Sequence, residues 1–248
     1  MISTKLRDAI IDWHAPRARA RVAKGIQLNE AFSAAGYPRS FFYPGLVLTT
    51  NAVFVDICGS ARRTASMEPQ VVKKYLDEYY DAVVPEIYER DGEIDKLIGD
   101  GIVAVFGPPF TGTDASAVVT GLASAVEFGR SVVKKLAYTP LEVKCAVRQG
   151  PLCFTVVGDE RYHEPTIVGN TLTELYALES VCVDRALNMF AGTTEHRLTD
   201  QSGPLRIGAA SFPFWRKGIR DIDLSGGRFT RTYVEEWVSP AVAGHSRR

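Results

Sequence analysis

The pattern of apolar and polar residues divides the chain into a helical beginning and a longer part in which strands and helices alternate. TKLRDAIIDWH (4–14) has apolar residues at helical spacing, and the following AAGYPRSFFYPG is aromatic and rich in turn residues. We interpret residues 1–48 as an N-terminal helical extension packed on the main domain; the alternative is a flexible link. The main domain is expected over residues 49–240, and a flexible tail over residues 241–248.

The first half of the main domain predicts the element order strand, helix, strand, strand, helix, strand. NAVFVDI (51–57) has the β-branched and aromatic content of a strand. A helix with one apolar face is predicted over about 67–90, and a second helix, with a Thr or Asp cap at its start, over about 113–137. This βαββαβ order predicts an α+β fold of the ferredoxin-like type, with helices on one face of a mainly antiparallel sheet.

A β-hairpin is predicted within GEIDKLIGDGIVAVFGPP (92–109). Two short apolar runs, Ile94 to Ile98 and Ile102 to Phe106, flank Gly99-Asp100-Gly101. The glycines supply the positive φ angles that tight hairpin turns need. Asp100 is therefore expected at the tip of the hairpin.

The second half of the chain predicts more strands and one further helix. A strand pair over 141–158 is expected to turn at Gly150-Pro151, and a helix is expected over about 171–190. The segments LRIGAASF and FTRTYVEEW are predicted to be the last strands.

Asp56 is the first candidate for chemistry, because a carboxylate at the end of a buried strand is costly unless a positive charge meets it. In a ferredoxin-like fold, the end of the first strand and the tip of the following hairpin lie side by side. Asp56 and Asp100 would then repel each other unless they share a cation, which favours a divalent metal. The alternative is that Asp56 pairs with Arg62 or Arg63 and that Asp100 only caps the hairpin. Spacing alone leaves both interpretations open.

The residues after Asp56 add a phosphate site to this picture. Gly59 allows the backbone to approach a ligand closely, and N–H groups at the start of the following helix can cradle phosphate oxygens. Paired carboxylates beside such a loop fit metal-assisted phosphoryl chemistry on a nucleoside triphosphate.

Composition and charge indicate an ordinary soluble protein. Lys+Arg and Asp+Glu both number 29, so overall charge favours neither a nucleic acid nor a membrane partner. The 4 cysteines form no CxxC pair, which favours a reducing compartment over zinc or disulfides. No apolar run approaches the roughly 18 residues that span a bilayer. We therefore expect a cytoplasmic protein.

Two motifs resemble a known family. VFVDICGSAR and GEIDKLIGDGIVAVFG look like the two metal-binding motifs of the class III nucleotidyl cyclases, the family of adenylate and guanylate cyclases. The resemblance continues through AVRQGPLCFTVVG and PTIVGNTLTELYALES, and more loosely to GGRFTRTYV. It covers roughly residues 50–190.

The resemblance implies a site and a reaction. Two metal ions, Mg²⁺ or Mn²⁺, would be held by Asp56, Asp100 and the carbonyl of Ile57, so that the ribose 3′-hydroxyl attacks the α-phosphate and pyrophosphate leaves. The phosphates would be held by backbone N–H groups of Cys58, Gly59, Ser60 and Ala61. The family builds its sites at head-to-tail interfaces, which implies a homodimer with two complete sites.

Further residues match or depart from the family's pattern. Lys96 stands where adenylate cyclases read the base, with Thr166 as its companion, and Arg228 is the best candidate to grip the terminal phosphates, with Lys217 second. Thr173 replaces an Asn that orients the ribose, and Ala177 replaces an Arg that stabilises transition-state charge. Loss of such a donor typically lowers the rate by about 10²–10³. Candidates to replace it are Arg62, Arg63 and Arg148.

This divergence also resembles the pyrimidine cyclases of bacterial antiphage systems of the Pycsar type. A smaller base needs a narrower pocket, and Phe41, Phe42 and Tyr43 are candidates for its wall. Lys96 can donate to O4 of uracil. We therefore expect a uridylate cyclase that converts UTP to cyclic UMP, which acts on a separate effector protein. The alternatives are an adenylate cyclase and a cyclase-like module that senses a nucleotide without turnover.

Overall fold

Two long strands, β1 (Leu46–Ile57) and β4 (Val143–Gly158), form the centre of the sheet. They pair antiparallel along the whole of β1, from Leu46 opposite Phe154 to Ile57 opposite Val143.

The protein is seen here as a computed structural model that describes residues 45–158, 163–190, 205–212, 220–224 and 229–238. The N-terminal extension, the tail, the Phe41–Tyr43 cluster, Lys217 and Arg228 lie outside these ranges.

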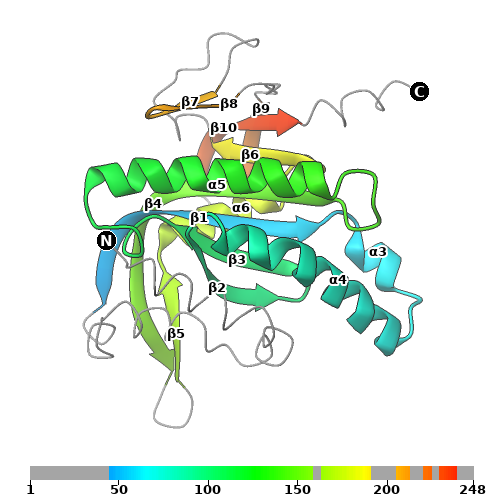
Figure 1. Ribbon diagram of the computed structural model, residues 1–248. Coiled ribbons are helices and arrows are strands. Elements are labelled where there is room, and N and C mark those ends of the chain that lie inside the picture. Colours follow the sequence, from blue (N-terminus) through cyan, green and yellow to red (C-terminus); the bar gives the residue numbers. More distant parts are fainter. Residues whose placement is uncertain (1–44, 159–162, 191–204, 213–219, 225–228, 239–248) are drawn as a thin grey trace.

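The remaining strands extend the sheet on both sides of this pair, in the order β2-β3-β1-β4-β6-β10-β9, with β5 also paired to β4 (Figure 1). The β4–β6 pair is parallel and the other pairs are antiparallel, so the sheet is mixed. A separate two-stranded sheet holds β7 and β8. The bounds are β2 (Gly92–Ile98), β3 (Gly101–Phe106), β5 (His163–Val168), β6 (Ala186–Phe190), β7 (Leu205–Ile207), β8 (Ala210–Phe212), β9 (Arg220–Leu224) and β10 (Phe229–Val238).

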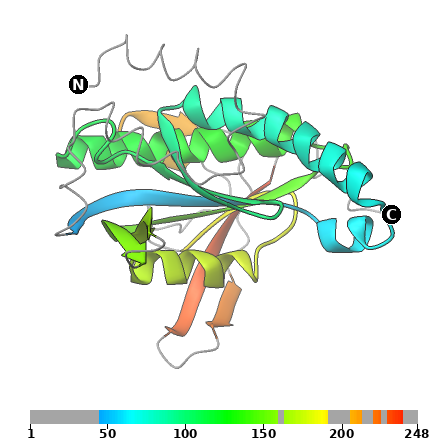
Figure 2. The same cartoon turned by 90° about the horizontal axis from the view of Figure 1, so that it is seen from below.

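Helices cover both faces of the sheet (Figure 2). On one face lie α4 and α5, which pack on Val53 and Val55 of β1; on the other lies α6, which packs on Ala52 and Phe54. This follows from the alternation of side chains along a strand. The helices are α3 (Ser60–Thr64), α4 (Pro69–Tyr88), α5 (Ala115–Lys135) and α6 (Asn170–Glu179).

The predicted βαββαβ order is confirmed by β1, α4, β2, β3, α5 and β4. Asp114 caps α5, since its carboxylate accepts a hydrogen bond from the N–H of Ala117 at 2.8 Å. Gly99, with a φ of 62°, turns the hairpin beside Asp100. The expectation that helices lie on one face holds for α4 and α5 and is wrong for α6.

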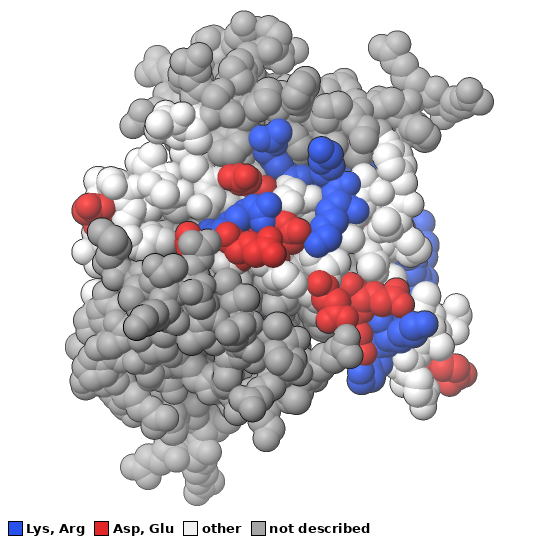
Figure 3. All heavy atoms as spheres, in the orientation of Figure 1, with Lys and Arg blue, Asp and Glu red and all other residues white. Residues whose placement is uncertain are grey.

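Glu86 of α4 links α4 to α5 near the outer face of these helices. Glu86 accepts hydrogen bonds from Ser131 at 2.6 Å, Arg90 at 2.8 Å and Lys135 at 2.9 Å. Basic and acidic residues are interspersed on the described part of this face (Figure 3). No helix within the described ranges is both long and apolar enough to cross a membrane.

The predicted turn at Gly150-Pro151 is wrong, because β4 runs straight through it. These residues pair with Thr50 and Thr49 of β1, whereas β6 pairs only with residues 145–147 of β4 and β5 only with residues 153–158. Pro151 thus lies where β4 has a neighbour on one side only, a position in which the missing N–H is tolerated. A side chain at Gly150 would meet Thr171 Oγ1 at 2.5 Å, so the glycine allows α6 to approach.

The predicted helix over about 171–190 is also wrong in its second half. α6 ends at Glu179, Arg185 has a φ of 61°, and Ala186–Phe190 form β6 between β4 and β10. Buried Asn188 fixes this connection: its amide donates to the carbonyls of Cys145 at 3.2 Å and Val183 at 3.1 Å. Tertiary pairing therefore overrides an apolar spacing that is compatible with a helix.

Candidate active site

The structure brings Asp56 and Asp100 together at one end of the sheet. Asp56 is the penultimate residue of β1, and Asp100 lies in the turn between β2 and β3. The antiparallel register, with Val55 opposite Ile102, carries the two segments to the same place. Burial raises the pKa of the Asp56 carboxyl to about 7, and the hydrogen bond and the negative charge of Asp100 add to that rise.

These two carboxylates suit a shared cation. Asp100 Oδ2 is buried and has no hydrogen-bond partner among the described residues. An unpartnered carboxylate oxygen beside a second carboxylate is costly unless a positive charge joins them. The described residues contain no group of three or more His, Cys, Asp or Glu side chains that could hold a metal ion. The carbonyl of Ile57 remains the predicted third ligand.

Lys144 of β4 is the positive charge that meets Asp56 within the protein. Its Nζ lies 3.5 Å from Asp56 Oδ2 and 2.7 Å from Glu179 Oε1 at the end of α6. Burial lowers the pKa of Lys144, but the hydrogen bond and charge of Glu179 and the charge of Asp56 outweigh burial and raise it. Among the described ion pairs, Asp56 pairs with Lys144 rather than with Arg62 or Arg63, the partners that the sequence suggested.

Three tyrosines of α4 donate hydrogen bonds to backbone carbonyls around this site, and two of these carbonyls lie next to the carboxylates. The Tyr79 hydroxyl donates to the carbonyl of Val55 at 3.2 Å, next to Asp56, and the Tyr80 hydroxyl donates to the carbonyl of Gly99, next to Asp100. Tyr75 donates to the carbonyl of Pro140 at 3.1 Å. Helix α4 therefore holds the segments that carry both carboxylates.

The loop after Asp56 differs in part from the expected phosphate cradle. Gly59 has a φ of 67°, the left-handed conformation that glycine adopts without strain, and α3 begins at Ser60. The N–H of Cys58, however, already donates to the carbonyl of Glu142 at 2.7 Å, so the expectation that it holds phosphate does not fit. Burial raises the pKa of the Cys58 thiol to about 12. Gly59, Ser60 and Ala61 remain the predicted donors.

Lys96 and Thr166, the two predicted base-reading residues, touch each other. Lys96 Nζ donates to Thr166 Oγ1 at 2.7 Å, although the two residues are 70 apart in sequence. Both are held by Asp95, whose side chain is fully buried: its Oδ1 accepts from the Thr166 hydroxyl at 3.2 Å, and its Oδ2 lies 3.3 Å from Lys96 Nζ. Burial raises the pKa of Asp95 to about 6, and the charge of Lys96 opposes that rise.

Helix α6 carries Tyr176 near this group. The Tyr176 ring packs edge-on against Phe54, with centroids 5.6 Å apart. Burial raises the pKa of Tyr176 to about 12, and the charge of Asp95 adds to it. On the same helix Thr173 is exposed and Ala177 is partly buried.

The three arginines that could replace a missing charge at Ala177 have different surroundings. Arg148 of β4 donates from Nε to Glu174 of α6. Arg62 is exposed on α3, and Arg63 of the same helix is partly buried.

Sequence reasoning missed Lys144, Asp95 and the anchoring hydroxyls of α4. Lys144 becomes a candidate only once the β1–β4 register sets it opposite Asp56. Asp95 directly precedes Lys96, but no local pattern indicates that it lies against β5. Tyr75 and Tyr79 belong to the apolar face that the helical spacing predicts, and their hydroxyls have no signal in that pattern.

Known proteins resemble the chain in sequence over about half of its length or more. No protein-family model matches. A terminal-differentiation-specific adenylate cyclase of Dictyostelium discoideum is 24% identical over 161 residues, which covers 63% of this chain and 7% of that protein. An adenylate cyclase of Anabaena cylindrica is 25% identical over 140 residues, which covers 55% of this chain and 28% of that protein. The matched segment is thus a small part of both relatives.

Solved structures share the fold over most of the chain. The guanylyl cyclase Cya2 superposes with a TM-score of 0.60 at 20% identity, covering 79% of this chain and 95% of that one. The adenylyl cyclase CyaB from P. aeruginosa superposes with a TM-score of 0.58 at 18% identity, covering 79% and 96%. The chain therefore has the fold of a cyclase catalytic domain.

If Asp56 and Asp100 share a cation, Mn²⁺ will stabilise the protein through both of them. At about 100 times its Kd, Mn²⁺ is expected to add about 2.7 kcal/mol to the free energy of unfolding, measured by thermal denaturation. Asp56→Asn and Asp100→Asn should each lose most of this gain. The control Asp77→Asn, at an exposed carboxylate of α4 paired with Lys73, should keep it. Equal stabilisation by Mn²⁺ in all three variants would contradict the assignment.

Proposed function

We propose that the protein is a nucleotidyl cyclase that converts a nucleoside triphosphate to a 3′,5′-cyclic nucleotide and pyrophosphate. The observation that carries this proposal is the carboxylate pair Asp56 and Asp100, with its unpartnered buried oxygen, at the end of the sheet of a cyclase fold. In phosphoryl transfer, two carboxylates can hold the metal ions that assist the reaction. Without a compensating positive charge, a buried pair of this kind destabilises the protein.

The chain's own residues have distinct tasks in this proposal. Asp56, Asp100 and the Ile57 carbonyl hold two divalent ions, Mg²⁺ or Mn²⁺. When bound, the ions lower the pKa of the ribose 3′-hydroxyl and neutralise the triphosphate. The 3′-oxygen bonds to the α-phosphorus, the bond from that phosphorus to the bridging oxygen breaks, the hydroxyl proton passes to solvent, and pyrophosphate leaves. N–H groups of Gly59, Ser60 and Ala61 hold the phosphates.

The remaining substrate contacts come from other elements. Thr173 orients the ribose with its hydroxyl, and Arg228 grips the terminal phosphates. Because Ala177 offers no charge to the α-phosphate, turnover is expected to be slow, by about 10²–10³ relative to a site with such a donor. The chain acts as a head-to-tail homodimer with two sites; the support is the resemblance of its motifs to a family that builds its sites in this way.

The substrate we propose is UTP, and the product cyclic UMP. Lys96 presents an N–H donor and Thr166 an oxygen acceptor, which match O4 and N3–H of uracil. The Tyr176 ring lies within electrostatic reach of Asp95, which holds this pair, and in this proposal it narrows the base pocket, since a pyrimidine needs less room than a purine. The divergence at Thr173 and Ala177 fits the Pycsar pyrimidine cyclases, so the product is proposed to act on a separate effector in antiphage defence in the cytoplasm.

ATP is the second candidate substrate. The same donor and acceptor also match N1 and the N6 amino group of adenine, so hydrogen bonding alone does not separate the two bases. The relatives from Dictyostelium discoideum and Anabaena cylindrica are named adenylate cyclases.

Product identification tests these proposals together. The purified chain is incubated with Mn²⁺ and ATP, GTP, CTP or UTP in turn, and products are identified by mass spectrometry. Cyclic UMP is expected to dominate, and Asp56→Ala and Asp100→Ala should abolish it while the protein stays folded. Cyclic AMP as the main product would overturn the base assignment. No product from any nucleotide would favour a module that only senses a nucleotide.

Tyr176 gives a separate test of base choice. Tyr176→Ala removes the ring beside the Lys96–Thr166 pair and should raise the ratio of ATP to UTP turnover, by about tenfold if ring size decides the choice. The comparison is made from kcat/KM for both nucleotides. Thr155→Ala, at a partly buried β4 position that faces Thr166 across the β4–β5 pair, serves as a control for general loosening. An unchanged ratio in Tyr176→Ala would remove Tyr176 from base selection.

A further inference from the structure

Arg63 of α3 has a buried donor that the protein itself does not satisfy. Its Nη1 is buried and finds no hydrogen-bond partner among the described residues. None of the described ion pairs includes this guanidinium. A buried cationic donor without an acceptor is costly, since charged groups lose the most on leaving water. The position therefore needs an explanation outside the described protein contacts.

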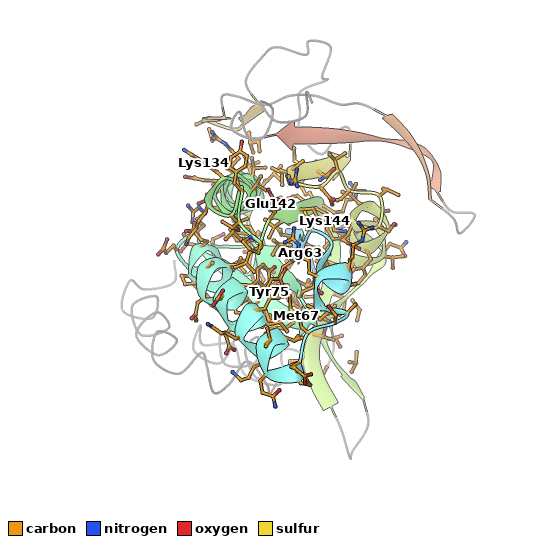
Figure 4. The ribbon with its side chains drawn as sticks, turned by 90° about the vertical axis from the view of Figure 1, so that its right-hand side faces the viewer. Arg63, Met67, Tyr75, Lys134, Glu142 and Lys144 are labelled. Carbon is orange, nitrogen blue, oxygen red and sulfur yellow. The ribbon has the colours of Figure 1, made fainter. Side chains whose placement is uncertain are left out.

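The guanidinium lies at the same end of the molecule as the carboxylate pair. Arg63 is seven residues after Asp56, and Figure 4 shows it beside Tyr75 on the same end as Lys144. Burial raises the pKa of Tyr75; the charge of Arg63 opposes this rise, and the charges of Asp100 and Asp56 add to it. Tyr75 thus lies within the electrostatic reach of Arg63 and of both carboxylates.

The chemistry of Arg63 points to an anion with several oxygens. A guanidinium offers a planar fork of donors that fits phosphate, and it stays charged at all working pH values. The carboxylates nearby are assigned to cations, so the anion has to come from the ligand. In the proposed reaction, the anion that leaves beside the carboxylate pair is pyrophosphate.

We propose that Arg63 binds the β- and γ-phosphates of the substrate and retains them as pyrophosphate, as an addition to the loop donors of Gly59, Ser60 and Ala61. This rests on the proposed function for the identity of the anion. The neighbouring Arg62 has the same charge on the same helix and is exposed, so it is not part of this contact.

Binding of pyrophosphate with Mg²⁺, measured by isothermal titration calorimetry on the full chain, tests the assignment. Arg63→Gln should weaken binding by about tenfold to a hundredfold, the range for a lost hydrogen bond to a charged group. The matched control Arg62→Gln should change the affinity by less than about twofold. Arg63→Lys keeps the charge without the fork and should fall between Arg63→Gln and the unchanged protein.

The outcomes separate the anion site from the cyclase activity. Unaltered pyrophosphate affinity in Arg63→Gln, or equal losses in Arg62→Gln and Arg63→Gln, would overturn the Arg63 assignment. If Arg63→Gln does not fold, Arg63→Lys decides: an affinity equal to that of the unchanged protein would count against the site. If pyrophosphate binds through Arg63 but no nucleotide is cyclised, the proposed function fails while the anion site stands. Absence of pyrophosphate binding in the unchanged protein would refute the site.

Discussion

The repulsion between Asp56 and Asp100 is the constraint on which the rest of the site depends. Burial raises the pKa of Asp56 to about 7, and the hydrogen bond and the negative charge of Asp100 add to that rise, so the charged pair is destabilised unless a positive charge joins it. Lys144 supplies part of the compensation at 3.5 Å, but it is shared with Glu179 at a shorter distance. Asp100 Oδ2 is left without a partner among the described residues. A sheet end built in this way favours a bound cation.

The frame that maintains this repulsion is rigid for identifiable reasons. β1 pairs with β4 along its whole length and with β3 on its other edge, so Asp56 cannot move away without breaking strand pairing. Tyr79 and Tyr80 tie the two carboxylate-bearing segments to α4. A site that binds ions or a transition state gains from such support, because its groups are already in place when the ligand arrives.

The sequence predicted those elements of the fold that depend on neighbouring residues, such as turns and long helices. The hairpin at Gly99 and the long helices α4 and α5 follow from turn glycines, apolar spacing and a polar cap, and the two motifs that resemble those of the cyclases contain Asp56 and Asp100. The failures have tertiary causes. Gly150-Pro151 is a turn signal, yet β4 passes through it because β1 pairs with both residues; Ala186–Phe190 has helical spacing, yet it is a strand between β4 and β10.

In the candidate site, too, local motifs predict some residues, while others are recognised only from tertiary contacts. Lys96 and Thr166 are predicted by motif, but the role of Asp95, which holds both, depends on β5 lying against β2. The N–H of Cys58 is occupied by the carbonyl of Glu142, a contact between distant segments that no motif records. Arg62 and Arg63 are adjacent residues of the same type, so the sequence does not show which of them faces the site; in the structure Arg62 is exposed and Arg63 is partly buried.

Anomalous X-ray diffraction from crystals grown with Mn²⁺ and a non-cyclisable nucleoside triphosphate shows whether Asp56 and Asp100 bind metal together. Manganese peaks are expected between the carboxylates of Asp56 and Asp100, at the distance of about 2 Å that oxygen ligands of small divalent ions adopt. Manganese bound elsewhere, with Asp56 joined to Lys144 and Asp100 turned away from the nucleotide, would contradict this expectation.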